Sequence, residues 1–235
     1  MSIAKAKKEL RKYASKKKAR DLSWFFKTGK GGYGEGDKFI GIIVPNIRKV
    51  AKECQDLPLQ EAIKLLKSPI HEERLLALLI MVLKFQKAQT EAQKKAVYKA
   101  YLTNTKYINN WDLVDLSSHE IIGSFLLKKS KKELYSLSKS ESLWERRISI
   151  VSTYRFIRNG QLKDTLKIAR ILLKDSYDLI HKAVGWMLRE VGKRDLRALE
   201  SFLKCHYKSM PRTMLRYSIE KFPENKRLRY LNGKV

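Results

Sequence analysis

The sequence predicts an all-α fold in which helices pair into repeats and stack as an α-solenoid. Three observations predict it. The 235 residues include only 11 glycines and 5 prolines, which favours helices over a turn-rich β architecture. Apolar residues follow the helical period along most of the chain, and no stretch alternates with a period of two for long enough to form a strand. Pairs of helices also recur at a nearly constant interval.

The first 44 residues differ from the rest of the chain. Residues 2 to 20 predict a single helix that lysine and arginine cover on most sides. The only glycine-rich passage follows, from Lys27 to Phe39, and it lacks the residue spacing of a nucleotide-binding loop. We therefore expect a flexible loop or short hairpin, with Lys27, Lys30 and Lys38 near a phosphate backbone.

From residue 45 onward, helix follows helix with short breaks. Pro45 suits the first turn of a helix that runs to about Cys54, and Thr90 is expected to cap a later one. Together with the helix that begins at Pro45, the predicted helices cover residues 57–68, 71–86, 90–104, 131–138, 143–158, 162–173, 177–191, 196–207 and 211–222.

The spacing of these helices indicates a repeat. The second helix of each pair starts near Glu72, Trp111, Trp144, Asp178 and Pro211, at intervals of 39, 33, 34 and 33 residues. Such a period is typical of an α-solenoid, loosely of the HEAT or armadillo type. We predict one domain over residues 1–235, in which a basic helix and glycine-rich loop (1–44) precede the helical repeats (45–235). Because solenoids curve, the sequence also predicts a basic concave face wide enough for a duplex.

The charge of the chain points to an anionic partner. Lysine and arginine outnumber aspartate and glutamate by 51 to 24, which gives a formal net charge of +27. So many positive charges repel one another in the folded state, which favours an anionic partner. Nucleic acid is the most common partner of this kind. A membrane surface is the competing anion, but the longest apolar run, Leu75 to Leu83, is far shorter than the roughly 20 residues that span a bilayer. That run predicts a buried helix.

Several classes of site lack support in the sequence. The four histidines are scattered, with no second ligand at metal-binding spacing, so we expect no metal and no small-molecule cofactor. Ser117 and Ser118 lack the glycines of a nucleophile elbow. Cys54 and Cys205 are isolated thiols, as suits a reducing cytoplasm. We expect a cytoplasmic monomer that associates with the nucleoid when it binds DNA.

Three of the second helices carry tryptophan beside charged residues. These residues are Trp111 and Asp115 on one helix, Trp144, Arg146 and Arg147 on the next, and Trp186 and Arg189 on the one after. A single tryptophan is more often part of a core. Their recurrence in register instead predicts a site that gathers two indoles, a carboxylate and an arginine on one lateral face. Asp112 points away from Asp115 and is expected to cap the helix or to form a surface pair.

Several of these segments are similar to a known family. WDLVD (111–115), WERRISIVSTYRFIR (144–158) and HKAVGWMLREVGKRD (181–195) closely resemble the AlkD-like DNA alkylation repair family, and so do PRTMLRYSIEKF (211–222) and EGDKFIGIIVP (35–45). The resemblance covers nearly the whole chain. It implies HEAT-like repeats that grip duplex DNA. It also implies a monofunctional glycosylase for cationic bases such as 3-methyladenine and 7-methylguanine.

The resemblance also implies roles for single residues. Trp111, Asp115 and Trp186 match the family's site residues, and Arg147 is the best match to its arginine, with Arg146 a close neighbour. When the N-glycosidic bond of an alkylated purine breaks, positive charge moves onto the sugar, and a carboxylate stabilises that charge more than it stabilises the ground state. Asp115 is the candidate for this role. The expected DNA-contacting residues are Lys27, Lys30, Lys38, Arg146 and Arg189.

Two other functions stay open at this point. One is a non-catalytic relative that binds bent, branched or damaged DNA. Two features favour it: the glycine-rich passage, and the aliphatic Ile43 at a position where the archetype of the AlkD-like family carries a polar glutamine. The other is a HEAT-like protein scaffold with a basic surface, which would ignore nucleic acid.

Overall fold

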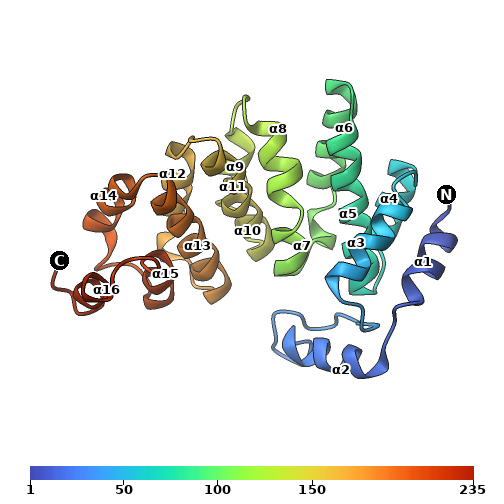
Figure 1. Cartoon of the computed structure of the whole chain (residues 1–235), viewed down its shortest axis with the longest axis horizontal. Helices are drawn as coiled ribbons and strands as arrows, with labels where there is room; N and C mark the ends of the chain where they lie inside the picture. The colour runs from blue at the N-terminus through green and yellow to red at the C-terminus, as the bar shows by residue number, and fades with distance from the viewer. The chain divides into compact units, whose positions relative to one another are not determined.

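Helices make up most of the computed structural model, which describes residues 1–235 (Figure 1). The one β-type pairing is an isolated bridge between Lys38 and Ile70. The all-α prediction is therefore confirmed. None of the helices combines the length and the apolar composition that crossing a bilayer requires.

Contacts group the residues into two compact units, Met1–Ile121 and Ile122–Val235, each with its own buried core. The single domain expected from the sequence stays a prediction. Unit 1 contains α1 (Ile3–Arg11), α2 (Lys16–Phe25), α3 (Val44–Glu53), α4 (Leu59–Leu66), α5 (His71–Lys87), α6 (Glu91–Leu102) and α7 (Trp111–Asp115). Unit 2 contains α8 (Ser124–Leu126), α9 (Lys132–Leu137), α10 (Leu143–Ser152), α11 (Tyr154–Arg158), α12 (Lys163–Ile171), α13 (Asp178–Arg194), α14 (Leu196–His206), α15 (Arg212–Ser218) and α16 (Glu224–Leu231).

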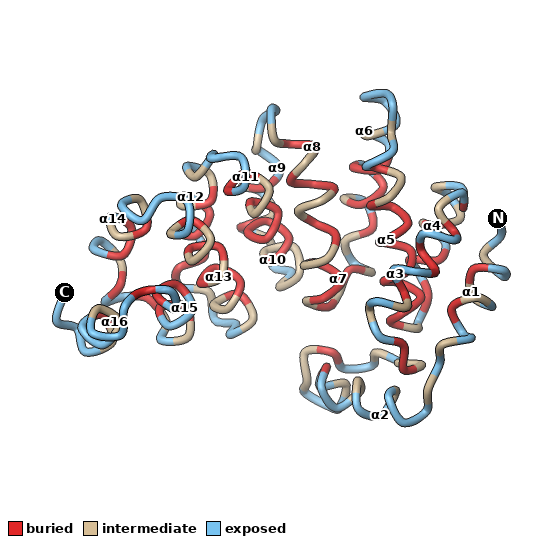
Figure 2. The backbone as a smooth tube through the Cα atoms, in the orientation of Figure 1, coloured by how far each residue is buried: buried red, intermediate tan, exposed pale blue.

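Helix α5 is the centre of unit 1. It packs against α3, α4, α6 and α7, and every residue from 71 to 82 is buried (Figure 2). The apolar run within it is therefore a buried helix, as predicted. A helix buried on all sides must find partners for its charged residues. Glu73 finds them on α1, where its carboxylate pairs with Lys7 at 2.8 Å and with Arg11 at 3.1 Å.

The N-terminal basic segment forms two helices, so the prediction of one helix over residues 2–20 is wrong. The backbone N–H of Ser15 donates to the carbonyl of Ile40 at 3.0 Å, which removes a donor that a continuous helix would use internally. The Ser15 side chain then caps α2 by accepting from the backbone N–H of Lys18. Gly41 makes the close approach possible, since a Cβ at this position would lie 2.1 Å from the Ser15 carbonyl oxygen. The break therefore depends on residues far along the chain from Ser15.

Helix α13 is the centre of unit 2, where it packs against α10, α12, α14 and α15. Gly185 allows α15 to approach closely, because a Cβ there would lie 2.5 Å from the Cβ of Tyr217. The predicted helix over residues 143–158 is divided at Thr153, whose hydroxyl bonds to the carbonyl of Ile150 at 2.6 Å. The sequence did not predict α16, at the end of the chain.

The helical repeat itself is confirmed. The second helices α5, α7, α10, α13 and α15 begin at residues 71, 111, 143, 178 and 212, each within one residue of its predicted start. Thr90 caps α6 in a reciprocal capping box with Gln93, as expected from the sequence. Inside the units, α4 packs on α5, α9 on α10, and α12 on α13.

Candidate active site

Trp111 and Asp115 stand at the two ends of α7, on one face of a helix only five residues long. Asn110 caps this helix, since its side-chain oxygen accepts the backbone N–H of Trp111 at 2.8 Å. Both Trp111 and Asp115 are partly exposed, whereas the three residues between them are buried. The short helix therefore presents an indole and a carboxylate together at the surface of unit 1.

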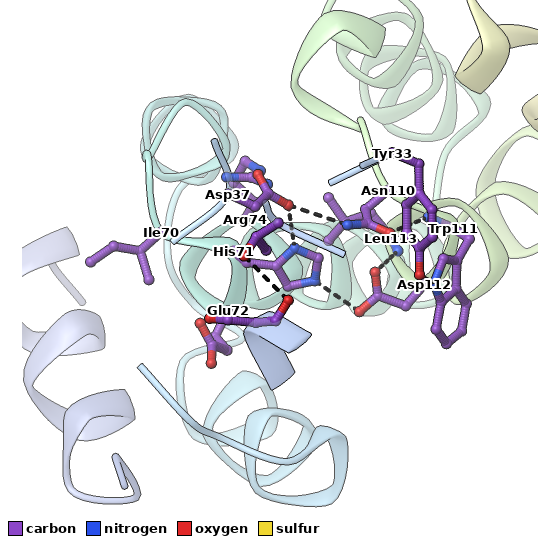
Figure 3. A network of polar contacts seen from close by, with 12 residues as sticks. Tyr33, Asp37, Ile70, His71, Glu72, Arg74, Asn110, Trp111, Asp112 and Leu113 are labelled. Carbon is purple, nitrogen blue, oxygen red and sulfur yellow. Dashed lines mark hydrogen bonds and ion pairs between the residues drawn. The ribbon is translucent and has the colours of Figure 1, made fainter. Parts of the chain in front are cut away.

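A buried histidine ties α7 to α5 (Figure 3). The imidazole of His71 lies between two carboxylates, with Nδ1 3.0 Å from Asp37 and Nε2 2.8 Å from Asp112. Asp37 also accepts from Arg74 at 2.6 Å and from the side chain of Asn110 at 3.3 Å. Three segments far apart in the sequence thus meet around one imidazole ring, which bonds to the residue that follows Trp111.

The charges of this cluster support one another. Burial lowers the pKa of His71, but the Asp112 carboxylate and the hydrogen bonds to Asp112 and Asp37 outweigh it and raise the pKa to about 9. Burial raises the pKa of Asp37, but the hydrogen bond from His71 and the charge of Arg74 outweigh it and hold this pKa below its usual value. At neutral pH His71 is therefore an imidazolium between carboxylates.

Asp112 is buried, which contradicts its predicted place in a surface pair, while its Oδ1 accepts the backbone N–H of Leu113 in the first turn of α7 at 2.8 Å. Its Oδ2 bonds to His71, and the capping position belongs to Asn110. The prediction depended only on the angle between Asp112 and Asp115 around the helix. That angle is correct, but the side away from Asp115 faces α5 and not water.

Glu72, the neighbour of His71, organises the chain that follows the glycine-rich passage. Its carboxylate accepts the backbone N–H groups of Ile40, Gly41 and Ile42, at distances from 2.8 to 3.1 Å. One buried carboxylate therefore satisfies three backbone hydrogen-bond donors. The segment that leads into α3 is therefore fixed against the start of α5.

The glycine-rich passage is a series of turns, so of the two alternatives expected from the sequence it forms a loop and not a hairpin. Backbone bonds link Gly32 to Gly29, Glu35 to Gly32, and Asp37 to Gly34. The passage reaches the candidate site through Tyr33, whose hydroxyl accepts from the indole Nε1 of Trp111 at 3.2 Å and donates to the carbonyl of Phe25 at 3.2 Å. Its contribution is therefore to hold the indole.

Aromatic rings continue from Trp111 toward α2. The indole stacks on Phe26, with centroids 5.1 Å apart and an interplanar angle of 16°, and meets Phe25 edge-on at 6.0 Å. Phe26 in turn stacks on Phe39, which stacks on His71. These rings border a cavity of about 420 Å³ that Ile43, Asp112, Glu72 and Asp115 also line.

The three lysines predicted to contact DNA, Lys27, Lys30 and Lys38, lie at the surface of unit 1. Lys27 has a left-handed backbone conformation (φ 51°) at the end of α2, with its ammonium 6.0 Å from the ring centre of Tyr33. The carbonyl of Lys38 accepts the backbone N–H of His71 at 2.9 Å, so the backbone at this position is fixed.

The arginines named from the sequence have internal partners in unit 2. Arg146 bonds to Asp175 at 2.6 Å and to the carbonyls of Ser140 and Glu141. Arg147 is buried and donates to the carbonyl of Leu179. Arg189 pairs with Glu190 and Glu220.

Trp186, on α13, is partly exposed and lies 5.8 Å from the ring of Tyr154, while Trp144 is partly exposed on α10. These residues belong to unit 2, whereas Trp111 and Asp115 belong to unit 1. Their meeting on one lateral face stays a prediction.

Sequence patterns did not reveal the support for Trp111. Tyr33, Asp37, His71 and Glu72 all contribute to it, and no local pattern connects them. One signal was available: α5 begins with four polar residues, HEER, and continues into a run that is buried on all sides. Polar residues at the start of such a helix require partners from elsewhere in the chain.

Comparisons with known proteins agree with this arrangement of helices. A family model described as DNA alkylation repair enzyme matches residues 6–222. Among solved structures, a predicted DNA alkylation repair enzyme from Enterococcus faecalis superposes with a TM-score of 0.69 at 18% sequence identity. The match covers 90% of this chain and 97% of that one. At this identity the likeness shows the fold. A search of curated proteins gave no match.

Proposed function

Because the chain belongs to the DNA alkylation repair enzyme family, we propose that it is a monofunctional DNA glycosylase. In this proposal it hydrolyses the N-glycosidic bond of cationic purines, such as 3-methyladenine and 7-methylguanine, in duplex DNA. The observation that carries the proposal is the pairing of Trp111 with Asp115 on the partly exposed face of α7, in a chain of net charge +27.

Asp115 supplies the chemical argument. As the bond between base and sugar breaks, the base leaves neutral and the sugar gains the positive charge of an oxocarbenium ion. At about 4 Å and an effective dielectric constant near 20, a carboxylate attracts that charge by roughly 4 kcal/mol. An attraction that develops only in the transition state corresponds to a rate increase on the order of a thousandfold. Asp115 also suits the positioning of the attacking water.

Trp111 supports the same reaction from beside Asp115. A π face attracts an electron-poor sugar or a cationic base by about 0.5 to 2 kcal/mol. The indole has a fixed orientation, because Tyr33 accepts its N–H and Phe26 stacks on it. The buried His71 cluster fixes the start of α7 in the same way. Orientation of this kind lowers the entropic cost of reaching the reactive geometry.

We expect the purified protein to release methylated purine from alkylated duplex DNA, with water as the only co-substrate. The measurement is chromatography of the free bases after incubation, with unmethylated DNA as the control. Salt-sensitive DNA binding without any base release would reject the glycosylase and favour the non-catalytic relative, a function consistent with the internal partners of Arg146 and Arg147. Absence of DNA binding would favour the protein scaffold.

We propose that Lys27, Lys30 and Lys38 bind phosphates of the DNA backbone. Changing all three to alanine is expected to weaken DNA binding and to reduce the slope of log K against log salt by about 0.9 for each phosphate that the variant no longer binds. The measurement is fluorescence anisotropy over a series of salt concentrations. The matched control replaces Lys52, Lys95 and Lys99, three exposed lysines of the same unit. Equal slopes for the two triple variants would contradict an assignment to this loop.

A further inference from the structure

We propose that the outer face of α2 is a second DNA-binding surface, on which Trp24 stacks against an unpaired base of the DNA that the candidate active site holds. This base is distinct from the alkylated one. The inference rests on the part of the proposed function that makes DNA the partner, and it adds a surface that base release does not require. It concerns only unit 1, because α2 lies within that unit.

The side chain of Trp24 is left uncovered by the protein. It has the highest exposed fraction among the exposed large hydrophobic side chains, 83%. Its indole has no hydrogen bond and no ring contact within the protein, although an indole offers a donor and two flat faces to a partner. Helix α2 as a whole buries none of its residues (Figure 2). A ligand that covered this ring would therefore remove apolar surface from water.

The residues that share a face with Trp24 are basic. Lys17 and Arg20 precede it by seven and four residues, and Lys16 precedes it by eight, so all three lie on its side of the helix. Each of the three is exposed, and none forms an ion pair. Asp21 is the only acidic residue of α2. The face therefore combines one aromatic ring with cations that have no partner in the protein.

These cations do not stabilise α2 itself. Lys16, Lys17 and Lys18 occupy its first turn, where the positive end of the helix dipole repels them, and that turn contains no acidic residue. An anionic partner offsets this repulsion, and the phosphates of DNA supply the anions. An aromatic ring among the cations adds a contact that a base accepts and a phosphate does not.

The outer face of α2 lies beside the candidate active site. Phe25, the residue after Trp24, meets the indole of Trp111 edge-on at 6.0 Å, and Phe26 stacks on that indole. Trp24 does not line the cavity that these rings border. DNA held at Trp111 and Asp115 would therefore pass close to α2 without needing Trp24 for the reaction.

The state of the base follows from the geometry of stacking. In an intact duplex each base is covered on both faces by its neighbours, so an indole finds no free face there. A base that is unpaired at a gap, a bulge or a branch can turn a face toward the protein. Stacking on an aromatic side chain tolerates any sequence, because every base has a π face. We therefore assign to α2 the recognition of DNA that damage or branching has left locally unpaired.

The first test compares two duplexes of the same sequence, one fully paired and one with a single unpaired adenine in a bulge. Fluorescence anisotropy is expected to show that the wild-type protein binds the bulged duplex about tenfold more tightly. Trp24→Ala should abolish this preference, and Trp24→Phe, which keeps a π face, should retain most of it. Equal affinities of the wild-type protein for the two duplexes would overturn the proposal.

The matched control changes the charges of the same face and keeps the ring. Replacing Lys16, Lys17 and Arg20 with glutamine is expected to weaken binding of both duplexes without changing the preference. The slope of log K against log salt should fall by about 0.9 for each phosphate that the variant no longer binds. Trp24→Ala should leave that slope unchanged, since stacking releases no counterions. Because all four side chains are exposed, both variants should fold. A preference that survives Trp24→Ala would contradict the stacking.

The second test reports on the contact itself. With the fluorescent base 2-aminopurine in the bulge, fluorescence is expected to fall when the wild-type protein binds, because the indole stacks on the base. It should not fall with Trp24→Ala. An unchanged signal with the wild-type protein would reject the contact. Binding to vesicles of phosphatidylglycerol that depends on Trp24, without any effect of Trp24 on DNA binding, would assign the face to a membrane surface and overturn the proposal.

Base release separates this inference from the proposed function. Release of 7-methylguanine from fully paired alkylated DNA should be nearly the same for Trp24→Ala as for the wild-type protein, because Trp24 does not line the cavity beside Asp115. Release without a preference for the bulged duplex would reject this inference and leave the proposed function intact. A preference that depends on Trp24, without release, would reject the glycosylase and leave this inference intact.

Discussion

Asp115→Asn is expected to lower the rate of base release from alkylated DNA about a thousandfold while leaving DNA affinity nearly unchanged. The substitution keeps the shape of the side chain and removes the charge that stabilises the oxocarbenium ion, an attraction of roughly 4 kcal/mol. Binding of intact DNA depends mainly on phosphate contacts, so it should survive. The measurement is single-turnover release of 7-methylguanine, with affinity determined in parallel.

Asp56→Asn is the control, because Asp56 is an exposed carboxylate of the same unit and lies outside the cavity that Asp115 lines. It should change neither the rate nor the affinity. A loss of less than tenfold in a folded Asp115→Asn protein would contradict the assignment of Asp115 as the stabilising charge. Such a result would leave phosphate binding and the family membership unaffected.

His71→Ala is expected to destabilise the protein by about 3 to 5 kcal/mol, the usual effect of removing one partner from a buried ionic cluster. The loss leaves the carboxylates of Asp37 and Asp112 close together without the cation between them. Urea denaturation followed by circular dichroism measures the effect. The control is His119→Ala, a partly exposed histidine of the same unit, for which we expect a change below about 1 kcal/mol.

The same cluster predicts how stability depends on pH. The pKa of His71 is about 9 in the folded protein against 6.5 for an ordinary histidine, so the folded state binds this proton more tightly than the unfolded state does. The resulting stabilisation, about 3 kcal/mol, is fully present below pH 6.5 and is lost as the pH rises through about 9. His71→Ala should not show this loss. A wild-type protein whose free energy of unfolding is constant between these pH values would contradict the buried imidazolium.

Local signals along the chain determined the helices and their period. The capping Thr90, the apolar run within α5 and the spacing of the second helices all act over a few residues, so they could be recognised without knowledge of contacts. The pairing of Trp111 with Asp115 is equally local, because residues four apart share one face of any helix. These features account for the fold class and for the centre of the candidate site.

Contacts between distant segments decided the rest. The break between α1 and α2 depends on two residues distant in sequence. The carbonyl of Ile40 accepts the backbone N–H of Ser15, which a continuous helix would bond internally, and Gly41 has no Cβ to prevent this close approach. The burial of Asp112 depends on His71, a partner 41 residues away that no helical period relates to it.

The cavity beside Trp111 also depends on contacts between distant segments. Its rings come from the end of α2, from the segment before α3 and from α7. The start of α5 fixes the second and third of these segments by hydrogen bonds, and the ring of His71 contacts that of Phe26 at the end of α2, with centroids 5.2 Å apart. A sequence states which side chains are available at short range. Contacts between residues separated by long loops depend on burial. Burial removes water from polar groups, and each buried polar group must then find a hydrogen-bond partner within the protein.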